Sequence, residues 1–178
     1  MTPQRITDRL TLRPPTGDDL ASIFAIYGDP RTNQFNPAGP LVDMRQAQLL
    51  LQSWQLHWQE QGYGQWAVAV RDMPGKLIGF GGIDTRQYLD VPRLNLGYRL
   101  GVPAWGQGYA TELGRAALTF AFAELALPMV YAVVRPQHRA SINVLEKIGM
   151  QRAEILDDVP GEPPSLVFKG HRVDRRTY

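Results

Sequence analysis

The chain has 178 residues, of which 44% are hydrophobic and 20% charged, and this is typical of one globular domain spanning residues 1–178. The absence of cysteine excludes a disulfide scaffold, a thiolate metal site and a cysteine nucleophile. Nineteen basic residues against 17 acidic ones give a net charge of +2, and Arg172–Arg176 is the one basic run, so nucleic-acid binding is not indicated. No apolar run is long enough for a membrane span or a signal peptide, which predicts a cytoplasmic protein.

The first third of the chain predicts a strand followed by two helices. Alternating leucines indicate a strand over Arg5–Arg13, and Thr16 then has the position of an N-cap for a helix over about 20–27. Turn residues fill 31–42. Asp43 is expected to cap a longer helix that ends near Gln61, before two glycines.

The rest of the chain predicts further strands interrupted by two helices. We expect strands over 66–70, 76–84, 93–100, 129–135, 150–156 and 166–171, and helices over 108–125 and 140–148. The order is β-α-α-β-β-β-α-β-α-β-β. A strand, helix and strand over 93–135 form a βαβ unit with parallel strands, while short turns make the other neighbours antiparallel. The sequence therefore predicts an α/β (mixed α+β) fold with a twisted sheet of about seven strands, mostly antiparallel, and helices on both faces.

The most informative stretch is Trp105-Gly106-Gln107-Gly108-Tyr109-Ala110-Thr111-Glu112, where a strand feeds a long helix. Two glycines let the main chain approach an anion, and the first N–H groups of a helix have no internal partner, so the stretch resembles a phosphate cradle. The stretch lacks the Gly-Lys-Ser/Thr of a P-loop. It also departs from a dinucleotide-binding motif, which needs Gly or Ala at the position of Thr111 and an acidic residue near Tyr131. A tight turn without any ligand is the alternative interpretation.

Several motifs together resemble the GNAT N-acetyltransferases, most closely the branch of ribosomal-protein N-terminal acetyltransferases (RimJ/RimL-like). They occur in the family's order over nearly the whole chain: Arg9-Leu10-Thr11-Leu12-Arg13-Pro14, Gly64-Gln65-Trp66-Ala67-Val68, Leu77-Ile78-Gly79-Phe80-Gly81-Gly82, Gly97-Tyr98-Arg99-Leu100, Trp105 through Glu112, and Ala140 through Met150. The likeness implies the GNAT fold and acetyl-CoA as co-substrate, without a metal.

The resemblance also implies which residues bind the cofactor. Backbone amides of Gly106, Gln107, Gly108, Tyr109, Ala110 and Thr111 would hold the pyrophosphate of coenzyme A. The pantetheine arm would lie where strands 93–100 and 129–135 diverge and would pair with the backbone of Leu100, Gly101 and Val102. His138, Arg139 and Ser141 would also contact the cofactor. Gln107 stands where the family often has Arg or Lys, so the backbone amides must contribute more of the binding.

Acetyl transfer to an amine needs a proton acceptor, an oxyanion donor and an acid for the thiolate. By the resemblance, a backbone N–H within Leu96–Leu100 is the oxyanion donor. Ser141 matches the family position of the acid, although it can equally cap its helix. Tyr109 is a second candidate for the acid, or a packing residue.

The general base departs from the family pattern, because Asn95 stands where related enzymes often have Glu. Asp84 is the nearest carboxylate on a neighbouring strand. Glu112 would instead stabilise the dipole of its helix, and a water relay is a further possibility. His138, in place of the family's Asn, can donate a hydrogen bond, act as a base or lie exposed in a loop.

The remaining candidates each have two interpretations. Trp54, Trp58 and Trp66 line an acceptor pocket or belong to the core, and Arg139 and Lys147 meet the 3′-phosphate of coenzyme A or are solvated charges. The three histidines lack metal-ligand spacing. We expect a monomer or homodimer whose acceptor is a protein or peptide N-terminal amine. A small-molecule amine, or a non-catalytic acyl-CoA sensor, is the alternative.

Overall fold

The computed structural model describes residues 4–172, so the basic run at the C-terminus lies, apart from Arg172, outside the described residues. The eight strands are β1 (Arg5–Ile6), β2 (Leu10–Arg13), β3 (Gln65–Val70), β4 (Leu77–Tyr88), β5 (Val91–Leu100), β6 (Met129–Val134), β7 (Gln151–Leu156) and β8 (Ser165–His171). The α-helices are α1 (Leu20–Tyr27), α2 (Met44–Gln61), α3 (Tyr109–Thr119) and α4 (Arg139–Lys147).

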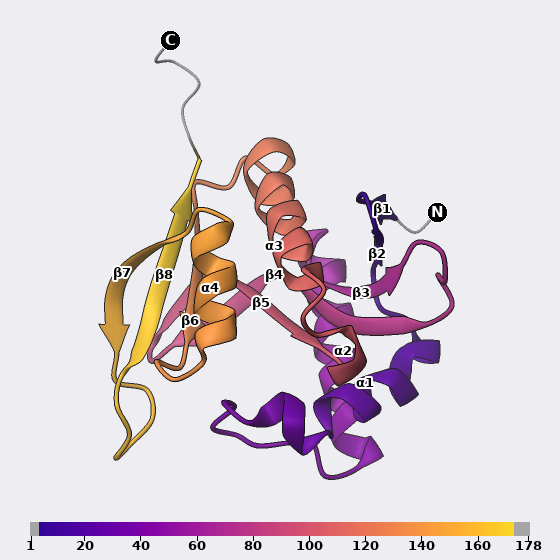
Figure 1. The fold of residues 1–178 in the computed structure, drawn as a ribbon, viewed down its shortest axis with the longest axis horizontal. Helices are drawn as coiled ribbons and strands as arrows, with labels where there is room; N and C mark the ends of the chain where they lie inside the picture. The colour runs from indigo at the N-terminus through magenta and orange to yellow at the C-terminus, as the bar shows by residue number, and fades with distance from the viewer. Residues whose placement is uncertain (1–3, 173–178) are drawn as a thin grey trace.

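All eight strands form one mixed sheet in the order β1-β2-β3-β4-β5-β6-β8-β7. In Figure 1, β6, β7 and β8 stand together on the left with α4, and β1, β2 and β3 lie on the right. The predicted parallel pair is confirmed as β5 with β6, and the other neighbours are antiparallel. The α/β class and the mostly antiparallel sheet are therefore as predicted.

The strand count was predicted one too low, because the segment 5–13 is a hairpin rather than one strand. Thr7 breaks it: its backbone N–H donates to the carbonyl oxygen of Leu10 at 2.9 Å, which turns the chain between β1 and β2. Arg5 pairs with Leu12 and Ile6 with Thr11 across the hairpin. The turn consequently projects residues 7–9 toward the start of α3.

Helices cover both faces of the sheet, as predicted. Along β3, Ala67 belongs to the core under α1 and α2, while its neighbours Trp66 and Val68 belong to the core under α3 and α4. This alternation follows from the two-residue period of a strand. The first core contains Ile23, Ile26, Ala47, Leu51, Trp54 and Phe80, and the second includes Leu96, Leu113, Ala117, Ile142 and Leu145.

The helix boundaries follow local capping. The Asp43 carboxylate accepts a hydrogen bond from the backbone of Gln46 at 2.8 Å, and Gly62, at a φ of +74°, ends α2. The predicted helix 108–125 is regular only to Thr119 and continues as a π-helical turn, Phe120–Glu124. That wider turn places the centre of the Phe120 ring 5.5 Å from the centre of the Trp66 ring.

Candidate functional site

The loop before α3 has the geometry of an anion cradle. Gly106 and Gly108 adopt left-handed backbone angles, with φ of +73° and +80°, and Gly108 is the N-cap of α3. Gly106, Gln107 and Gly108 are exposed. Within residues 4–172, no backbone N–H from Gly106 through Thr111 is hydrogen-bonded to a protein acceptor. These amides at the positive end of the helix dipole suit a pyrophosphate.

The side chain of Gln107 organises this loop from within. Its Nε2 donates to the carbonyl oxygen of Pro103 at 2.9 Å. Trp105 acts similarly, since its Nε1 donates to the carbonyl oxygen of Leu100 at 3.0 Å. Gln107, which stands where the resemblance leads us to expect a cation, is thus engaged with the backbone, which leaves the cradle to main-chain amides.

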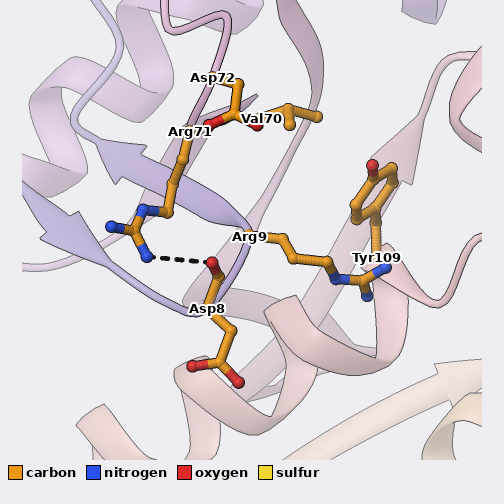
Figure 2. Close-up of a pocket in the computed structure, with 6 residues that line it drawn as sticks. All are labelled: Asp8, Arg9, Val70, Arg71, Asp72 and Tyr109. Atoms are coloured by element: carbon orange, nitrogen blue, oxygen red, sulfur yellow. Dashed lines mark hydrogen bonds between the residues drawn. The ribbon is translucent and has the colours of Figure 1, made fainter.

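A cation reaches the loop from the β1–β2 turn. Arg9 donates from Nη1 to the carbonyl oxygen of Gln107 at 2.7 Å, and its guanidinium lies 4.6 Å from the centre of the Tyr109 ring. Figure 2 shows Arg9 extending toward Tyr109, beside the contact of Arg71 with the backbone oxygen of Asp8. Hollows of about 430 and 360 Å³ flank Arg9. Sequence reasoning missed this residue.

Glu112 is a partly buried anchor whose two carboxylate oxygens are both engaged, which does not suit a catalytic base. Its Oε1 accepts from the Thr7 hydroxyl at 2.6 Å and from the backbone of Arg9 at 2.7 Å, and its Oε2 accepts from Arg9 Nε at 2.7 Å. Burial alone would raise the pKa of Glu112, but the hydrogen bonds from Thr7 and Arg9 outweigh burial and lower it. Glu112 is therefore an ionised acceptor that joins the hairpin to α3.

The end of β5 opens a gap in the sheet. A single residue pair, Asn95 with Tyr131, links β5 to β6. On the edge of β5 that faces β4, the N–H of Gly101 donates to the carbonyl oxygen of Ile78 at 2.8 Å, and Val102 begins a short 3₁₀ turn. The Leu100 oxygen retains one lone pair beyond the Trp105 contact. The paired region of β5 and β6 is therefore short.

Ser141 points at a partner that sequence reasoning did not select. Its hydroxyl lies 3.0 Å from the hydroxyl of Tyr98, which comes from β5. The N-cap of α4 is His138, so Ser141 is not the cap residue of its helix. Burial raises the pKa of Tyr98 to about 12, partly offset by the bond to Ser141, so the phenol stays protonated near neutral pH. The pair therefore holds two hydroxyl protons beside the gap, on the side of α4.

The opposite face of β5 carries the polar candidates. Asn95 lies opposite Asp84 on β4, and its Oδ1 accepts from the Tyr88 hydroxyl at 2.6 Å. That contact orients the amide, so Nδ2 is directed away from Tyr88. A Cβ on Gly97 would lie 3.3 Å from this Nδ2. Asn95 thus offers a donor above a glycine that leaves space for a ligand.

Asp84 is a carboxylate with an altered proton affinity. Burial raises its pKa to about 6, against opposing effects of His57, Gln65 and Arg86. Gln65 donates from Nε2 to Asp84 Oδ2 at 3.2 Å. His57 is occupied, because its Nδ1 lies 2.8 Å from the carbonyl oxygen of Tyr63 and its Nε2 accepts from the backbone of Thr85 at 3.2 Å. Asp84 is thus the titratable group suited to accept a proton near neutral pH.

His138 and Arg139 begin α4 on the other side of the gap. His138 is the N-cap residue and stacks on Phe35, with ring centres 4.4 Å apart. Burial and the charge of Arg99 lower its pKa, so it is neutral at pH 7. Arg139 is exposed. The structure consequently packs His138 against Phe35, half-buried, rather than leaving it in an exposed loop.

The remaining candidates divide between core and surface. Trp54 and Trp66 are buried core residues, and Trp58 packs against the core with its Nε1 donating to the carbonyl oxygen of Gln65 at 2.8 Å. Lys147 is exposed at the end of α4. Within the described residues, no three His, Asp or Glu side chains gather as metal ligands. Nor does any helix of residues 4–172 combine the length and apolar character needed to cross a membrane.

Comparison with known proteins decides the family. The family model of the acetyltransferase (GNAT) domain matches residues 9–151. The chain belongs to the GNAT family. Among its relatives, the uncharacterized protein YkkB of Bacillus subtilis is 32% identical over 157 residues, which are 85% of this chain and 87% of YkkB. The uncharacterized N-acetyltransferase YoaA of the same organism is 28% identical over 84% of each chain. The protein is an acetyl-CoA-dependent N-acetyltransferase.

Solved GNAT structures share the whole fold. An acetyltransferase from Agrobacterium tumefaciens is 29% identical and superimposes with a TM-score of 0.79 over 96% of this chain and 95% of its own. Two more distant structures come from Vibrio cholerae. One is 23% identical, with a TM-score of 0.74 over 96% of this chain and 99% of its own. The other is 18% identical, with a TM-score of 0.76 over 93% of this chain and 97% of its own. These last two show the fold alone. The first is described as a putative ribosomal-protein-serine acetyltransferase, and the second as a spermidine N-acetyltransferase in complex with CoA and spermine.

Proposed function

We propose that this GNAT enzyme acetylates a protein or peptide N-terminal amine by direct attack in a ternary complex. One observation carries the transfer from acetyl-CoA: the unpaired amides of Gly106 through Thr111 follow β5 in the chain, and β5 pairs with β6 at a single residue. A cofactor that follows this path has the Ser141 and Tyr98 hydroxyls on one face of β5. The acceptor then approaches from the other face, over Gly97.

The residues divide the proton transfers between the two faces. Asp84 takes a proton from the acceptor ammonium, directly or through water, which leaves a nucleophilic amine that Asn95 Nδ2 helps to position. The N–C bond forms and the C–S bond breaks. The nitrogen loses its second proton through water to the Ser141 oxygen, which replaces the proton that Ser141 gives to the sulfur. Ser141, connected to Tyr98, supplies a proton to the departing sulfur. Acetyl-CoA supplies the activated acyl group, and no covalent enzyme intermediate is needed.

The choice of acceptor rests on branch resemblance. The motifs of the RimJ/RimL-like branch and the fold shared with a putative ribosomal-protein-serine acetyltransferase favour a polypeptide N-terminus. The fold shared with a spermidine N-acetyltransferase favours the second candidate, a small-molecule amine. The protein would act as a monomer or homodimer in either case.

Turnover distinguishes an enzyme from a sensor that only binds acyl-CoA. Thiol release from acetyl-CoA should be measured over a panel of N-terminal peptides, amino acids, polyamines and amino sugars, with mass spectrometry of the products. We expect a peptide to give the highest kcat/KM. Preference for another amine would overturn the polypeptide assignment. Tight cofactor binding without acetylation of any amine would refute catalysis.

A further inference from the structure

Arg99 differs from the other partly buried arginines. Within residues 4–172, four arginines of intermediate exposure pair with a carboxylate: Arg5 with Glu124, Arg13 with Asp19, Arg93 with Glu154, and Arg135 with Asp158. Arg99 is also of intermediate exposure, yet no carboxylate in the same part of the chain pairs with it. A cation in a partly desolvated position normally has a counter-charge.

The contacts of Arg99 position its guanidinium without neutralising it. Nη1 donates to Asn33 Oδ1, and the guanidinium carbon lies 4.6 Å from the centre of the Tyr27 ring. Both partners are uncharged. A guanidinium carries five N–H donors, and Asn33 is the one hydrogen-bond acceptor that it meets among the described residues. The remaining donors can therefore serve a ligand.

The position of Arg99 on β5 relates it to the acceptor. Asn95, Gly97 and Arg99 alternate along one face of the strand, so Arg99 lies about 7 Å along β5 from Gly97. Gly97 leaves a space bordered by two amide nitrogens, since a Cβ added there would lie 3.3 Å from Asn95 Nδ2 and 3.9 Å from Gln65 Nε2. A ligand whose reactive amine lies over Gly97 would place its next few atoms at Arg99.

The charges around this position favour an anion. Burial lowers the pKa of Arg99, and the positive charge of Arg86 lowers the pKa further, while Tyr27 acts in the opposite direction. A second arginine thus faces the same region. Asp84, the carboxylate on this face of β4 and β5, lies opposite Asn95, whereas Arg99 lies opposite Phe80. Four residues of strand separate Asp84 from Phe80, about 13 Å. Asp84 is thus left for the amine.

We propose that the acceptor carries a carboxylate close to its amine and that Arg99 binds this carboxylate. The inference rests on the acetyl transfer of the proposed function, and not on its choice of a polypeptide acceptor. Two sources supply this chemistry: a free amino acid, or a peptide with an acidic side chain next to its N-terminal residue. A guanidinium matches either carboxylate with two parallel hydrogen bonds.

Matched acceptors test the proposal. Free amino acids are compared with their primary amides, and C-terminally amidated Ala-Glu and Ser-Asp peptides with their Ala-Gln and Ser-Asn counterparts. For at least one of the two sources, we expect kcat/KM to be at least tenfold higher for the acid. Equal kcat/KM for acid and amide in both sets would overturn the role of Arg99 but leave acetyl transfer intact. Failure to acetylate any amine would refute the proposed function instead.

Two arginine variants localise the effect. In Arg99→Met the preference for the acid should disappear while turnover of the neutral amide is retained, and Arg99→Lys should keep part of the preference. Arg86→Met, which removes an exposed arginine of the same region, should keep most of it. Calorimetric titration with coenzyme A confirms that each variant is folded. An undiminished preference in folded Arg99→Met, or a preference fully lost in folded Arg86→Met, would contradict the proposal.

Discussion

Arg9 holds Glu112 through two hydrogen bonds, one from its backbone N–H to Oε1 and one from Nε to Oε2, both 2.7 Å long. The two residues are 103 positions apart. Through the same side chain Arg9 also holds the carbonyl oxygen of Gln107. The hairpin of β1 and β2 therefore fixes both the loop 106–108 and the first turn of the helix that follows it.

Removing this clamp should weaken cofactor binding more than chemistry. In Arg9→Met, the loop loses the contact to Gln107, and we expect KM for acetyl-CoA to rise about tenfold, equivalent to about 1.4 kcal/mol, with kcat changed less. S-acetyl-pantetheine, which lacks the pyrophosphate, should be used equally by variant and wild type. Arg5→Met, which removes the Arg5–Glu124 ion pair of the same hairpin, is the matched control. Similar KM changes in both variants would assign the effect to hairpin docking alone.

The left-handed backbone of Gly108 predicts a sharp loss in Gly108→Val. A β-branched residue is strained at a φ of +80°, and its Cβ would lie 3.4 Å from Arg9 Nη2. We expect the affinity for coenzyme A, measured by calorimetry, to fall about 100-fold. Gly75→Val lies in an open turn with nothing within 4 Å of the added Cβ and should bind normally. Retained affinity in Gly108→Val would remove this loop from the cofactor site.

The hydroxyl pair of Ser141 and Tyr98 predicts a defect in turnover. Ser141→Ala should lower kcat about 100-fold if it protonates the leaving thiolate, with the Kd of coenzyme A unchanged. Tyr98→Phe should act in the same direction and should add little in the double variant, because the two groups form one unit. Asn143→Ala, which alters an exposed polar residue of the same helix, is the control. Normal kcat in Ser141→Ala would leave Ser141 without a catalytic role.

Asp84 predicts the acidic limb of the pH profile. With a pKa of about 6, the group becomes a competent base as the pH rises through 6, so kcat/KM should increase over pH 5–7. In Asp84→Asn this limb should vanish and the rate should fall about 100-fold. Glu60→Gln, which neutralises an exposed carboxylate on α2, controls for general charge effects. An unaltered profile in Asp84→Asn would favour a water relay without a protein base.

The same carboxyl group affects stability with a defined sign. Because the folded-state pKa of Asp84 lies above 3.8, the folded protein holds more protons between pH 4 and 6 than the unfolded chain. Protonated Asp84 therefore stabilises the fold relative to ionised Asp84. This stabilisation is fully present below pH 3.8 and is lost as the pH rises through 6. Asp84→Asn should therefore gain in Tm relative to wild type between pH 4 and pH 7. A constant difference across this range would contradict the raised pKa.

Features encoded by neighbouring residues could be predicted from the sequence. The caps at Asp43 and Gly62, the strand pattern of Leu94–Leu100 and the glycines before α3 all depend on residues a few positions apart. The break at Thr7 was missed because Ile6, Leu10 and Leu12 all occupy even-numbered positions, as they would in one continuous strand. The π-helical turn at Phe120 was missed because its apolar period continues that of α3.

The contacts that complete the site join distant segments. Arg9 with Glu112, Tyr98 with Ser141 and Arg99 with Asn33 each depend on the tertiary fold. The sequence assigned Tyr98 to a family motif within the strand 93–100, and only the placement of α4 gives its hydroxyl a partner. The orientation of the Asn95 amide likewise depends on Tyr88, which no local pattern indicates.

The single residue pair between β5 and β6 has a consequence for the protein outside catalysis. Without a ligand arm in the gap, the facing edges of two half-sheets carry peptide groups that can pair with another polypeptide. Coenzyme A would act there as a substitute strand that shields both edges. In the absence of coenzyme A, the protein should exchange amide hydrogens faster at Tyr98 and Leu100, whose N–H groups point away from β4, and should become more prone to self-association on storage.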